Sequence, residues 1–153
     1  IQATLDENST AEDVKYKVTN IKAGAFRESD FLVYIKLPKT ITDIDEGVFS
    51  YCTGVETIRL PNDGIKKIVD KAFKGCYSLY KMVIPRSVTE IGNYAFADCM
   101  DLEYVVFNKP IDKVGKKIFY DCESLKKISI PKGFLSHFEN LLPEYKELLV
   151  EKK

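Results

Sequence analysis

The side chains best suited to nucleophilic or metal chemistry are a single histidine, His137, and four cysteines, Cys52, Cys76, Cys99 and Cys122. A thiol nucleophile needs a base beside it, and a zinc site needs close cysteine pairs with a histidine nearby. Here neighbouring cysteines are 23 or 24 residues apart, and the histidine lies in the terminal segment beyond the last of them. This spacing favours buried structural thiols over a catalytic or metal centre.

The sequence also lacks the common motifs of phosphate and sugar chemistry. It contains neither the GxxxxGK[ST] nor the GxGxxG pattern of phosphate-binding loops. The acidic residues Asp43, Asp45 and Glu46 lie close together, but this pattern is more typical of a solvated corner than of a glycosidase pair. The sequence therefore predicts a protein that is not an enzyme and that holds no cofactor and no metal.

The cysteines belong to a unit that recurs five times along the chain. Its most regular position is a phenylalanine, at intervals of 23, 24, 23 and 23 residues, present as Phe26, Phe49, Phe73, Phe96 and Phe119. Apolar residues also recur five positions before each phenylalanine and six, nine and eleven positions after it. A fixed period of this length indicates one supersecondary unit that buries its apolar side by stacking on copies of itself.

Each unit is predicted to contain one short strand and one return segment. In the fourth copy, Leu102, Val105 and Phe107 show the alternation of a strand that is apolar on one side. A proline directly follows the strand in four copies and ends it, as Pro38, Pro61, Pro85 and Pro131. Residues 91–96 offer a short helical or 3₁₀ return. The single 24-residue interval predicts a bulged corner at Asn62–Gly64.

The four cysteines occupy the same position of their units, three residues after the phenylalanine, where the first unit has Ser29. Equivalent side chains in stacked units point the same way and not at each other, which disfavours disulfides even at the short spacing between units. We therefore expect a row of reduced, buried thiols.

The repeats divide the chain into three parts of one domain. Residues 21–132 contain the five repeats. Residues 1–20 are predicted to form a partial rung or cap before them, because apolar residues alternate at Val14, Tyr16 and Val18. Residues 133–153 leave the repeat and are predicted to cap the stack, with apolar residues at helical spacing before Pro143 and a last short strand at 148–150.

Charge and hydropathy argue against two classes of partner. The 23 lysines and arginines balance the 23 aspartates and glutamates, so nothing favours nucleic acid or an anionic membrane. No apolar run approaches the roughly 20 residues of a membrane-spanning helix. The chain starts at Ile1 without a methionine or a leader pattern, so we expect that a signal peptide has been removed or that the chain is part of a larger protein.

The outward positions of the predicted strands are the candidate binding residues. They lie eight and ten positions after the phenylalanines and include Tyr34, Lys36, Thr57, Arg59, Lys81, Val83, Tyr104 and Val106. Tyrosine and arginine are favoured anchors of interfaces, and repeat scaffolds bind partners along such faces. The alternative interpretation is an ordinary solvated sheet face that carries β-forming residues.

The repeat closely resembles the BspA-like subclass of leucine-rich repeats, whose unit runs roughly I-G-x-x-A-F-x-x-C-x-x-L-x-x-I-x-I-P-x-x-V-x-x. Residues 88–102 match it almost in full, and the resemblance covers about residues 14–132, with mild departures such as Ser29 for cysteine and Asn108 for proline. It implies an α/β repeat solenoid, a leucine-rich-repeat right-handed superhelix of five units. A parallel sheet would form one face, and short helical, 3₁₀ or irregular returns the other.

The resemblance also implies proteins of bacteria and some protists that are often secreted or attached to the cell surface and act in adhesion. We therefore expect a non-enzymatic module, extracellular or on the cell surface, that binds a protein or glycan ligand, with host molecules among the candidates. The alternatives are an intracellular interaction scaffold and an accessory repeat domain of a larger surface enzyme. The full-length gene separates these three, because a wall anchor favours the first and a catalytic neighbour the last.

Overall fold

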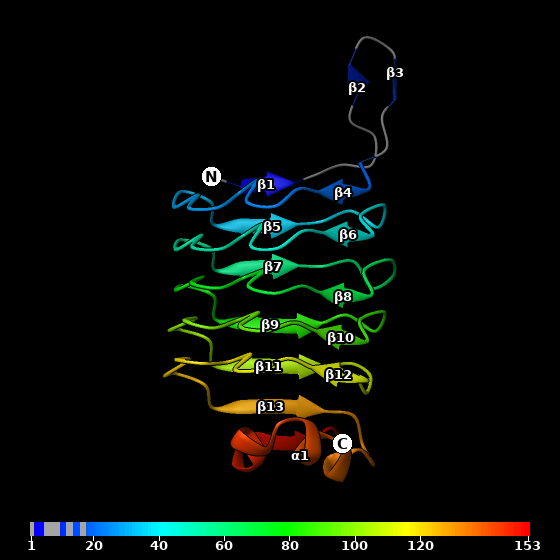
Figure 1. Cartoon of the computed structure of the whole chain (residues 1–153), viewed down its shortest axis with the longest axis vertical. Helices are drawn as coiled ribbons and strands as arrows, with labels where there is room; N and C mark the ends of the chain where they lie inside the picture. The colour runs from blue at the N-terminus through cyan, green and yellow to red at the C-terminus, as the bar shows by residue number, and fades with distance from the viewer. Residues whose placement is uncertain (1, 5–9, 12–13, 16–17) are drawn as a thin grey trace.

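The chain winds into a stack of rungs along one axis, and each rung adds a strand to a parallel sheet (Figure 1). The computed structural model describes residues 2–4, 10–11, 14–15 and 18–153. In these residues the sheet has seven strands whose order follows the chain. They are β1 (Gln2–Thr4), β5 (Tyr34–Lys36), β7 (Thr57–Arg59), β9 (Lys81–Ile84), β11 (Tyr104–Phe107), β13 (Lys127–Ile130) and β14 (Leu149–Glu151). The predicted parallel-sheet solenoid is confirmed.

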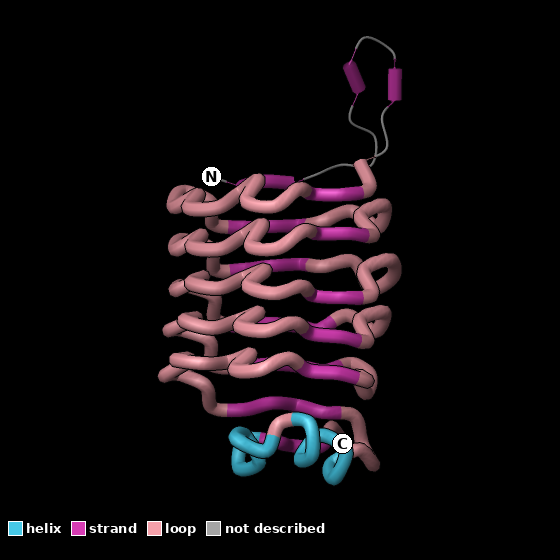
Figure 2. Tube along the Cα trace, viewed as in Figure 1, coloured by secondary structure: helices cyan, strands magenta, loops and turns pink. Residues whose placement is uncertain are grey.

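Shorter strands run along the return side of the stack (Figure 2). There, β4 (Asn20–Ile21) pairs with β6 (Asp43–Ile44). Further along, β8 (Lys67–Ile68), β10 (Glu90–Ile91) and β12 (Lys113–Val114) form a three-stranded parallel sheet. In each of these strands, the second residue is the apolar one that stands five positions before the phenylalanine. The sequence did not predict these strands, because two residues are too few to show an alternation.

The return segments around the phenylalanines are turns. Of the predicted kinds of return, the irregular one is therefore correct, and the helical or 3₁₀ one is wrong for these segments. The reason is a pair of residues with left-handed backbone in every return, since such a residue ends a right-handed helix. One residue lies two positions before the phenylalanine and the other two positions after it. They are Gly24, Gly47, Lys71, Tyr94 and Lys117, and then Glu28, Tyr51, Gly75, Asp98 and Asp121, with φ from 53° to 72°.

The phenylalanines form a continuous stack through the core. Successive ring centroids, from Phe26 to Phe119, are 5.3, 5.5, 5.5 and 5.8 Å apart, and each pair of rings is stacked. These distances lie in the range that aromatic pairs prefer. Phe73 and Phe96 are fully buried, whereas Phe26 is only partly buried because it lies near the end of the stack. The inferred register of the repeats is therefore correct.

The cysteines form a second row beside the phenylalanines. All four thiols are free; Cys122 is partly exposed and the other three are buried. Each Sγ donates to the backbone carbonyl of the phenylalanine in the preceding rung, at 2.9 Å for Cys52, 3.3 Å for Cys76 and Cys99, and 3.1 Å for Cys122. At Phe26, Phe49 and Phe73 the carbonyl also accepts a backbone N–H from its own turn, so there the thiol adds a second hydrogen bond that links two rungs.

The 24-residue interval produces a bend at residues 62–64, as predicted, and Gly64 there has a φ of 107°. The extra residue disturbs the adjoining part of the sheet. Whereas β9 and β11 pair through four residues, β7 and β9 pair through one, Thr57 with Lys81.

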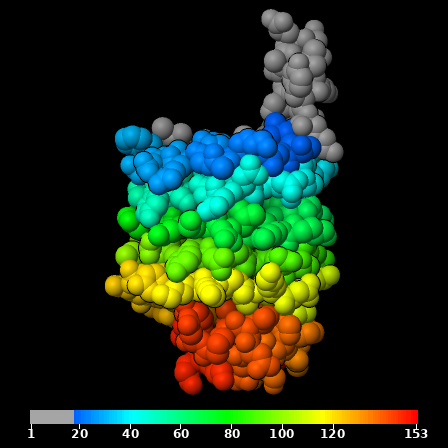
Figure 3. All heavy atoms as spheres, in the orientation of Figure 1, coloured from blue at the N-terminus to red at the C-terminus, as the bar shows by residue number. Residues whose placement is uncertain are grey.

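The two ends of the stack differ in how well they were predicted. At the C-terminus, α1 (Leu135–Leu141) packs Phe138 on Phe107 at 4.9 Å, η1 (Pro143–Leu148) follows, and β14 pairs with β13. The helix and the last strand lie where they were expected, and Figure 3 shows this segment, in red, packed against the last rung.

At the N-terminus, a strand does precede the first repeat, but β1 supplies it and not residues 14–18, whose alternation had predicted the partial rung. In the structure, β3 (Val14–Lys15) pairs antiparallel with β2 (Thr10–Ala11), while β1 adds to the large sheet beside β5. Tyr16 lies outside the described residues. Among the residues that the structure describes, no helix has the length and apolar character needed to cross a membrane.

Candidate functional site

The outward face of the large sheet brings the predicted binding residues into register. Tyr34 pairs with Thr57, Thr57 with Lys81 and Lys81 with Tyr104, so these four form one row across β5, β7, β9 and β11. All four side chains are exposed or partly exposed, because the alternate residues of these strands point into the core. The row extends to Lys127 in β13.

The remaining predicted residues form a second row that is divided at the bend. Lys36 pairs with Arg59 on one side of it, and Val83 pairs with Val106 on the other. No residue pair joins Arg59 to Val83, since β7 and β9 pair only at Thr57. We call the eight residues of both rows the sheet strip. The second row of the strip has a cationic part, Lys36 and Arg59, on β5 and β7, and an apolar part, Val83 and Val106, on β9 and β11.

Two contacts fix aromatic side chains on the sheet strip. The Arg59 Cζ lies over the Tyr34 ring, 5.7 Å from its centroid, in a cation–π arrangement. The Tyr104 ring meets Tyr80 edge to face, with centroids 5.4 Å apart. Sequence reasoning missed Tyr80, which is half exposed and precedes β9 by one residue. The repeat could have indicated Tyr80, because this residue lies seven positions after its phenylalanine, where exposed residues recur in other repeats.

An ion pair borders the Tyr80–Tyr104 contact. Lys126 Nζ donates to Glu103 Oε1 at 2.6 Å. This hydrogen bond lowers the pKa of Glu103 and raises the pKa of Lys126. Partial desolvation, followed by a hydrogen bond with Tyr104, raises the pKa of Tyr80. This corner therefore presents the neutral phenol of Tyr80 and the ring of Tyr104 beside a compact pair of opposite charges.

The thiols and the histidine have no arrangement for catalysis. Burial raises the pKa of Cys52 to about 11 and moves those of Cys76 and Cys99 further upward, so these groups stay neutral near pH 7. His137 Nε2 lies 2.7 Å from the carbonyl oxygen of Ile111, to which the ring can donate a hydrogen bond. Within the described part of the chain, no three histidine, cysteine, aspartate or glutamate side chains gather as metal ligands.

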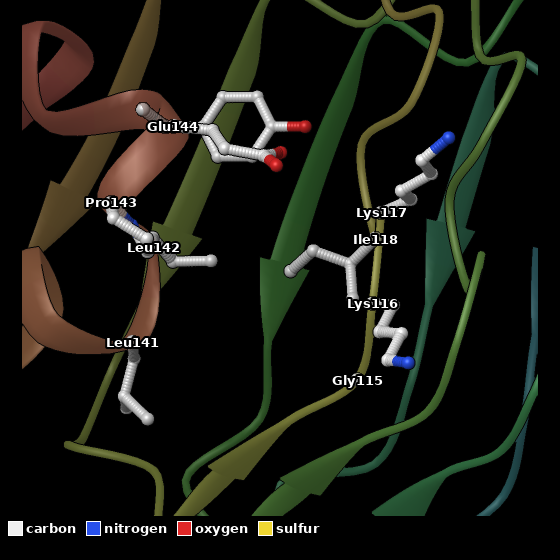
Figure 4. Close-up of a pocket in the computed structure, with 9 residues that line it drawn as sticks. Gly115, Lys116, Lys117, Ile118, Leu141, Leu142, Pro143 and Glu144 are labelled. Carbon is white, nitrogen blue, oxygen red and sulfur yellow. The ribbon is translucent and has the colours of Figure 1, made fainter.

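A pocket of about 290 Å³ lies between the last return and the C-terminal cap. In Figure 4, the Ile118 side chain points toward Leu142, while the amines of Lys116 and Lys117 point away from them. The two ammonium groups therefore do not converge on this pocket. We interpret it as the seam between the repeats and the cap.

A family profile described as the BspA type leucine rich repeat region matches residues 19–142 in six copies. The chain belongs to this family. The six copies are one more than the five units inferred from the phenylalanines, and they run past residue 132, where the fifth unit was expected to end. The BspA-type family is typically non-catalytic.

Solved structures with the same fold come from bacterial leucine-rich repeat proteins. A leucine rich cell surface protein of Faecalibacterium prausnitzii A2-165 has a TM-score of 0.80 and 25% identity, over 92% of this chain and 34% of that protein. A leucine rich repeat protein of T. pallidum has a TM-score of 0.76 and 29% identity, over 99% of this chain and 68% of that one.

The pneumococcal vaccine antigen PcpA has a TM-score of 0.75 and 16% identity, over 99% of this chain and 41% of that protein, which shows a shared fold alone. None of the curated proteins matches the chain in sequence. The BspA-type chain spans about a third of the length of the F. prausnitzii protein it resembles.

Proposed function

We propose that this chain is a recognition module of a secreted or cell-surface protein and that it binds a protein or glycan partner across several rungs of the sheet strip. The observation that carries the proposal is the row Tyr34, Thr57, Lys81 and Tyr104, held in register by parallel pairing. Such a row places recognition groups on a scaffold whose spacing is fixed by backbone hydrogen bonds, so little entropy is lost when a partner binds.

The dimensions favour an extended partner. Rungs of a parallel sheet repeat at about 4.8 Å, so the row from β5 to β13 spans roughly 20 Å. A small metabolite is normally held in a concave pocket, whereas a face of this length suits a protein surface or a glycan chain. The fixed rings of Tyr34 and Tyr104 provide contact area at low entropic cost, and Arg59 adds a cationic donor.

The likeness to a cell surface protein of F. prausnitzii supports a surface location, as does membership of the BspA-type family. Membership of this typically non-catalytic family supports a role in recognition without chemistry. Binding of a host or neighbouring cell molecule is the adhesive activity that fits both.

The test is a binding screen of the purified chain against extracellular matrix proteins and a glycan array, followed by variants of the sheet strip. The double substitution Tyr104→Ala and Arg59→Ala should weaken binding of any partner found by at least about tenfold, because it removes two anchor side chains. The matched control is Lys67→Ala with Lys113→Ala, which changes exposed residues of the return-side sheet.

The double variant should melt near the parent temperature, since neither side chain is in the core. A partner whose affinity survives the strip variant but is lost in the control variant would show that the return side is the binding face. The proposal would then be wrong.

A further inference from the structure

The return side of the first three rungs contains a pocket of about 490 Å³ that the repeat pattern does not require. It lies among Gly24 and Gly47, the ring of Tyr51, and the cationic side chains of Arg27, Lys71 and Lys74. None of these residues belongs to the sheet strip. The pocket is therefore separate from the proposed binding face.

The pocket exists because the first repeats depart from the later ones at one position. Two residues before the phenylalanine, the first two repeats have Gly24 and Gly47, whereas the next three have Lys71, Tyr94 and Lys117. All five residues have left-handed backbone, so side chains are accepted at this position. A Cβ added to Gly24 would meet no heavy atom closer than 3.9 Å, so the space beside it is open.

A second departure supplies an aromatic wall. Two residues after the phenylalanine, Tyr51 stands where the other repeats have an acidic residue or glycine. Its ring lies against Gly75 of the next rung, and a Cβ on Gly75 would overlap that ring. The absence of a side chain at Gly75 thus allows the ring to occupy this place.

Cationic groups surround the ring. The Arg27 Cζ lies 6.0 Å and the Lys74 Nζ 5.8 Å from the Tyr51 centroid. Lys71 Nζ is 2.8 Å from Glu46 Oε1, the one carboxylate that lines the pocket. Two further carboxylates face these cations from outside the lining, Glu28 at 3.1 Å from Arg27 Nε and Asp98 at 3.4 Å from Lys74 Nζ.

These ion pairs leave the pocket able to take an anion. The pairs of Arg27 and Lys71 are solvent-exposed, and such pairs contribute little, so an anionic ligand can compete for the cations. The Nε bond to Glu28 uses one of the five N–H groups of the Arg27 guanidinium, whose planar fork matches a carboxylate or sulfate.

We propose that this pocket binds an anionic sugar unit, one that carries a carboxylate or a sulfate group. Arg27 and Lys71 pair with the anionic group, and the Tyr51 ring packs against the apolar face of the sugar. The volume is in the range of small-ligand pockets and is larger than a lone inorganic ion needs. This site is additional to the sheet strip and does not depend on it.

An extended acidic peptide fits this site less well. One recurring mode of binding an extended peptide pairs its backbone with free backbone groups of the receptor. Here backbone groups of the returns already pair with one another. The N–H of Glu28 donates to the carbonyl of Ser50, and the N–H of Tyr51 donates to the carbonyl of Lys74. A ligand of this pocket is therefore recognised by side chains, and a set of side chains around a hollow suits a compact ligand.

The test is a ¹H–¹⁵N NMR titration of the whole chain with a sulfated uronic-acid disaccharide, compared with a neutral disaccharide and a glutamate-rich hexapeptide. The expected result is that only the sulfated disaccharide shifts the amide signals of Gly24, Gly47 and Tyr51. Arg27→Gln should weaken its binding at least about tenfold, because a charge-assisted hydrogen bond is lost. Gly24→Tyr should abolish binding by filling the hollow while keeping every charge.

The matched control is Lys117→Gln, which removes the cation at the position of the fifth repeat that corresponds to Lys71 and should leave the affinity unchanged. The residue introduced by Gly24→Tyr already stands at the equivalent position 94, and a melting curve verifies its fold. If Gly24→Tyr does not fold, the outcome is decided by the affinity of Arg27→Gln. The proposal is overturned if no probe shifts the three amides, if Gly24→Tyr or Arg27→Gln binds as the parent does, or if the hexapeptide binds equally well.

Discussion

The carboxylate of Asp70 accepts two hydrogen bonds from Asn93, a residue 23 positions further along the chain. The backbone N–H of Asn93 donates to Oδ1 at 2.9 Å and its side-chain amide donates to Oδ2 at 2.9 Å. Asn93 Oδ1 in turn accepts from the backbone N–H of Lys116 at 2.8 Å. Three consecutive rungs are thus tied by one side-chain ladder on the return side.

Replacing Asp70 with alanine should lower the free energy of unfolding by about 1–3 kcal/mol, because two hydrogen bonds to a charged acceptor are lost. It should also weaken the acid dependence of stability. The hydrogen bond from Asn93 lowers the pKa of Asp70 below 3.8, so the unfolded chain binds the proton more readily. The stabilisation by Asp70 is therefore complete at pH values above its pKa in the unfolded chain. It is lost as the pH falls through its pKa in the native protein.

Urea melts between pH 2 and pH 7 measure this effect. Asp63→Ala, which removes a carboxylate from the exposed bend, is the matched control and should keep the acid dependence of the parent. An acid slope that is the same in the parent and in Asp70→Ala would contradict the role assigned to the ladder.

The buried thiols predict a loss of stability at alkaline pH. Burial raises the pKa of Cys52 from 9.0 to about 11 and raises that of Cys76 further. Above pH 9 the unfolded thiols release protons that the native ones retain, so the free energy of unfolding falls as the pH rises. The expected loss is about 1.4 kcal/mol per buried thiol by pH 10.

Chemical denaturation between pH 8 and pH 10 checks this loss, and Cys76→Ala should have a shallower slope than the parent. The same thiols should resist a thiol reagent in the native state and react in denaturant. Rapid modification of Cys76 and Cys99 in the folded protein would contradict the burial described above.

The phenylalanine stack should support the fold unequally along its length. Phe73→Ala and Phe96→Ala should each cost about 3–5 kcal/mol, because each ring is fully buried between two others. Phe26→Ala should cost less, since that ring is only partly buried. Phe31→Ala is the control, because its side chain is 80% exposed. Equal losses at Phe26 and Phe96 in urea melts would count against this account of the stack.

The ladder also requires a glycine beside it. A Cβ on Gly92 would overlap the Asp70 carboxylate and the backbone of the preceding rung. Gly92→Ala should therefore destabilise the chain by about 1–3 kcal/mol, the usual cost of overpacking. Combining it with Asp70→Ala should recover only part of the loss, because the backbone contacts remain. A Gly92→Ala variant as stable as the parent would mean that the rungs can separate without cost.

Most of the fold could be predicted because the repeat superimposes five independent copies of each position. Phe26, Phe49 and Phe73 occupy the same position of their repeats. Because equivalent residues stack on one another in the core, few other registers of the repeats are possible. The short return-side strands could not be predicted, because they depend on contacts between rungs and leave no local pattern. The N-terminal strand was misassigned because the alternation at Val14 indicates a strand but does not identify its partner.

The candidate sites were predicted less completely. The period-2 alternation placed Tyr104 and Arg59 on the exposed face, but Tyr80 precedes the regular strand and was not counted with it. The pocket beside Tyr51 was missed because sequence reasoning looked for what the repeats share. Gly24 and Gly47 occupy the same position of their repeats. Two glycines at this position indicate left-handed backbone and a missing side chain, and they would have pointed to the pocket.

The single pairing of Thr57 with Lys81 has a mechanical consequence. When the ends of the chain are pulled, the rungs bear the load in series, so the second and third rungs should part first on the sheet side. On the return side the same two rungs stay joined by hydrogen bonds from Phe49 N–H to Ala72 and from Tyr51 N–H to Lys74. Under such a load the stack should open at this boundary as a hinge, and the opening would move Lys36 and Arg59 away from Val83 and Val106.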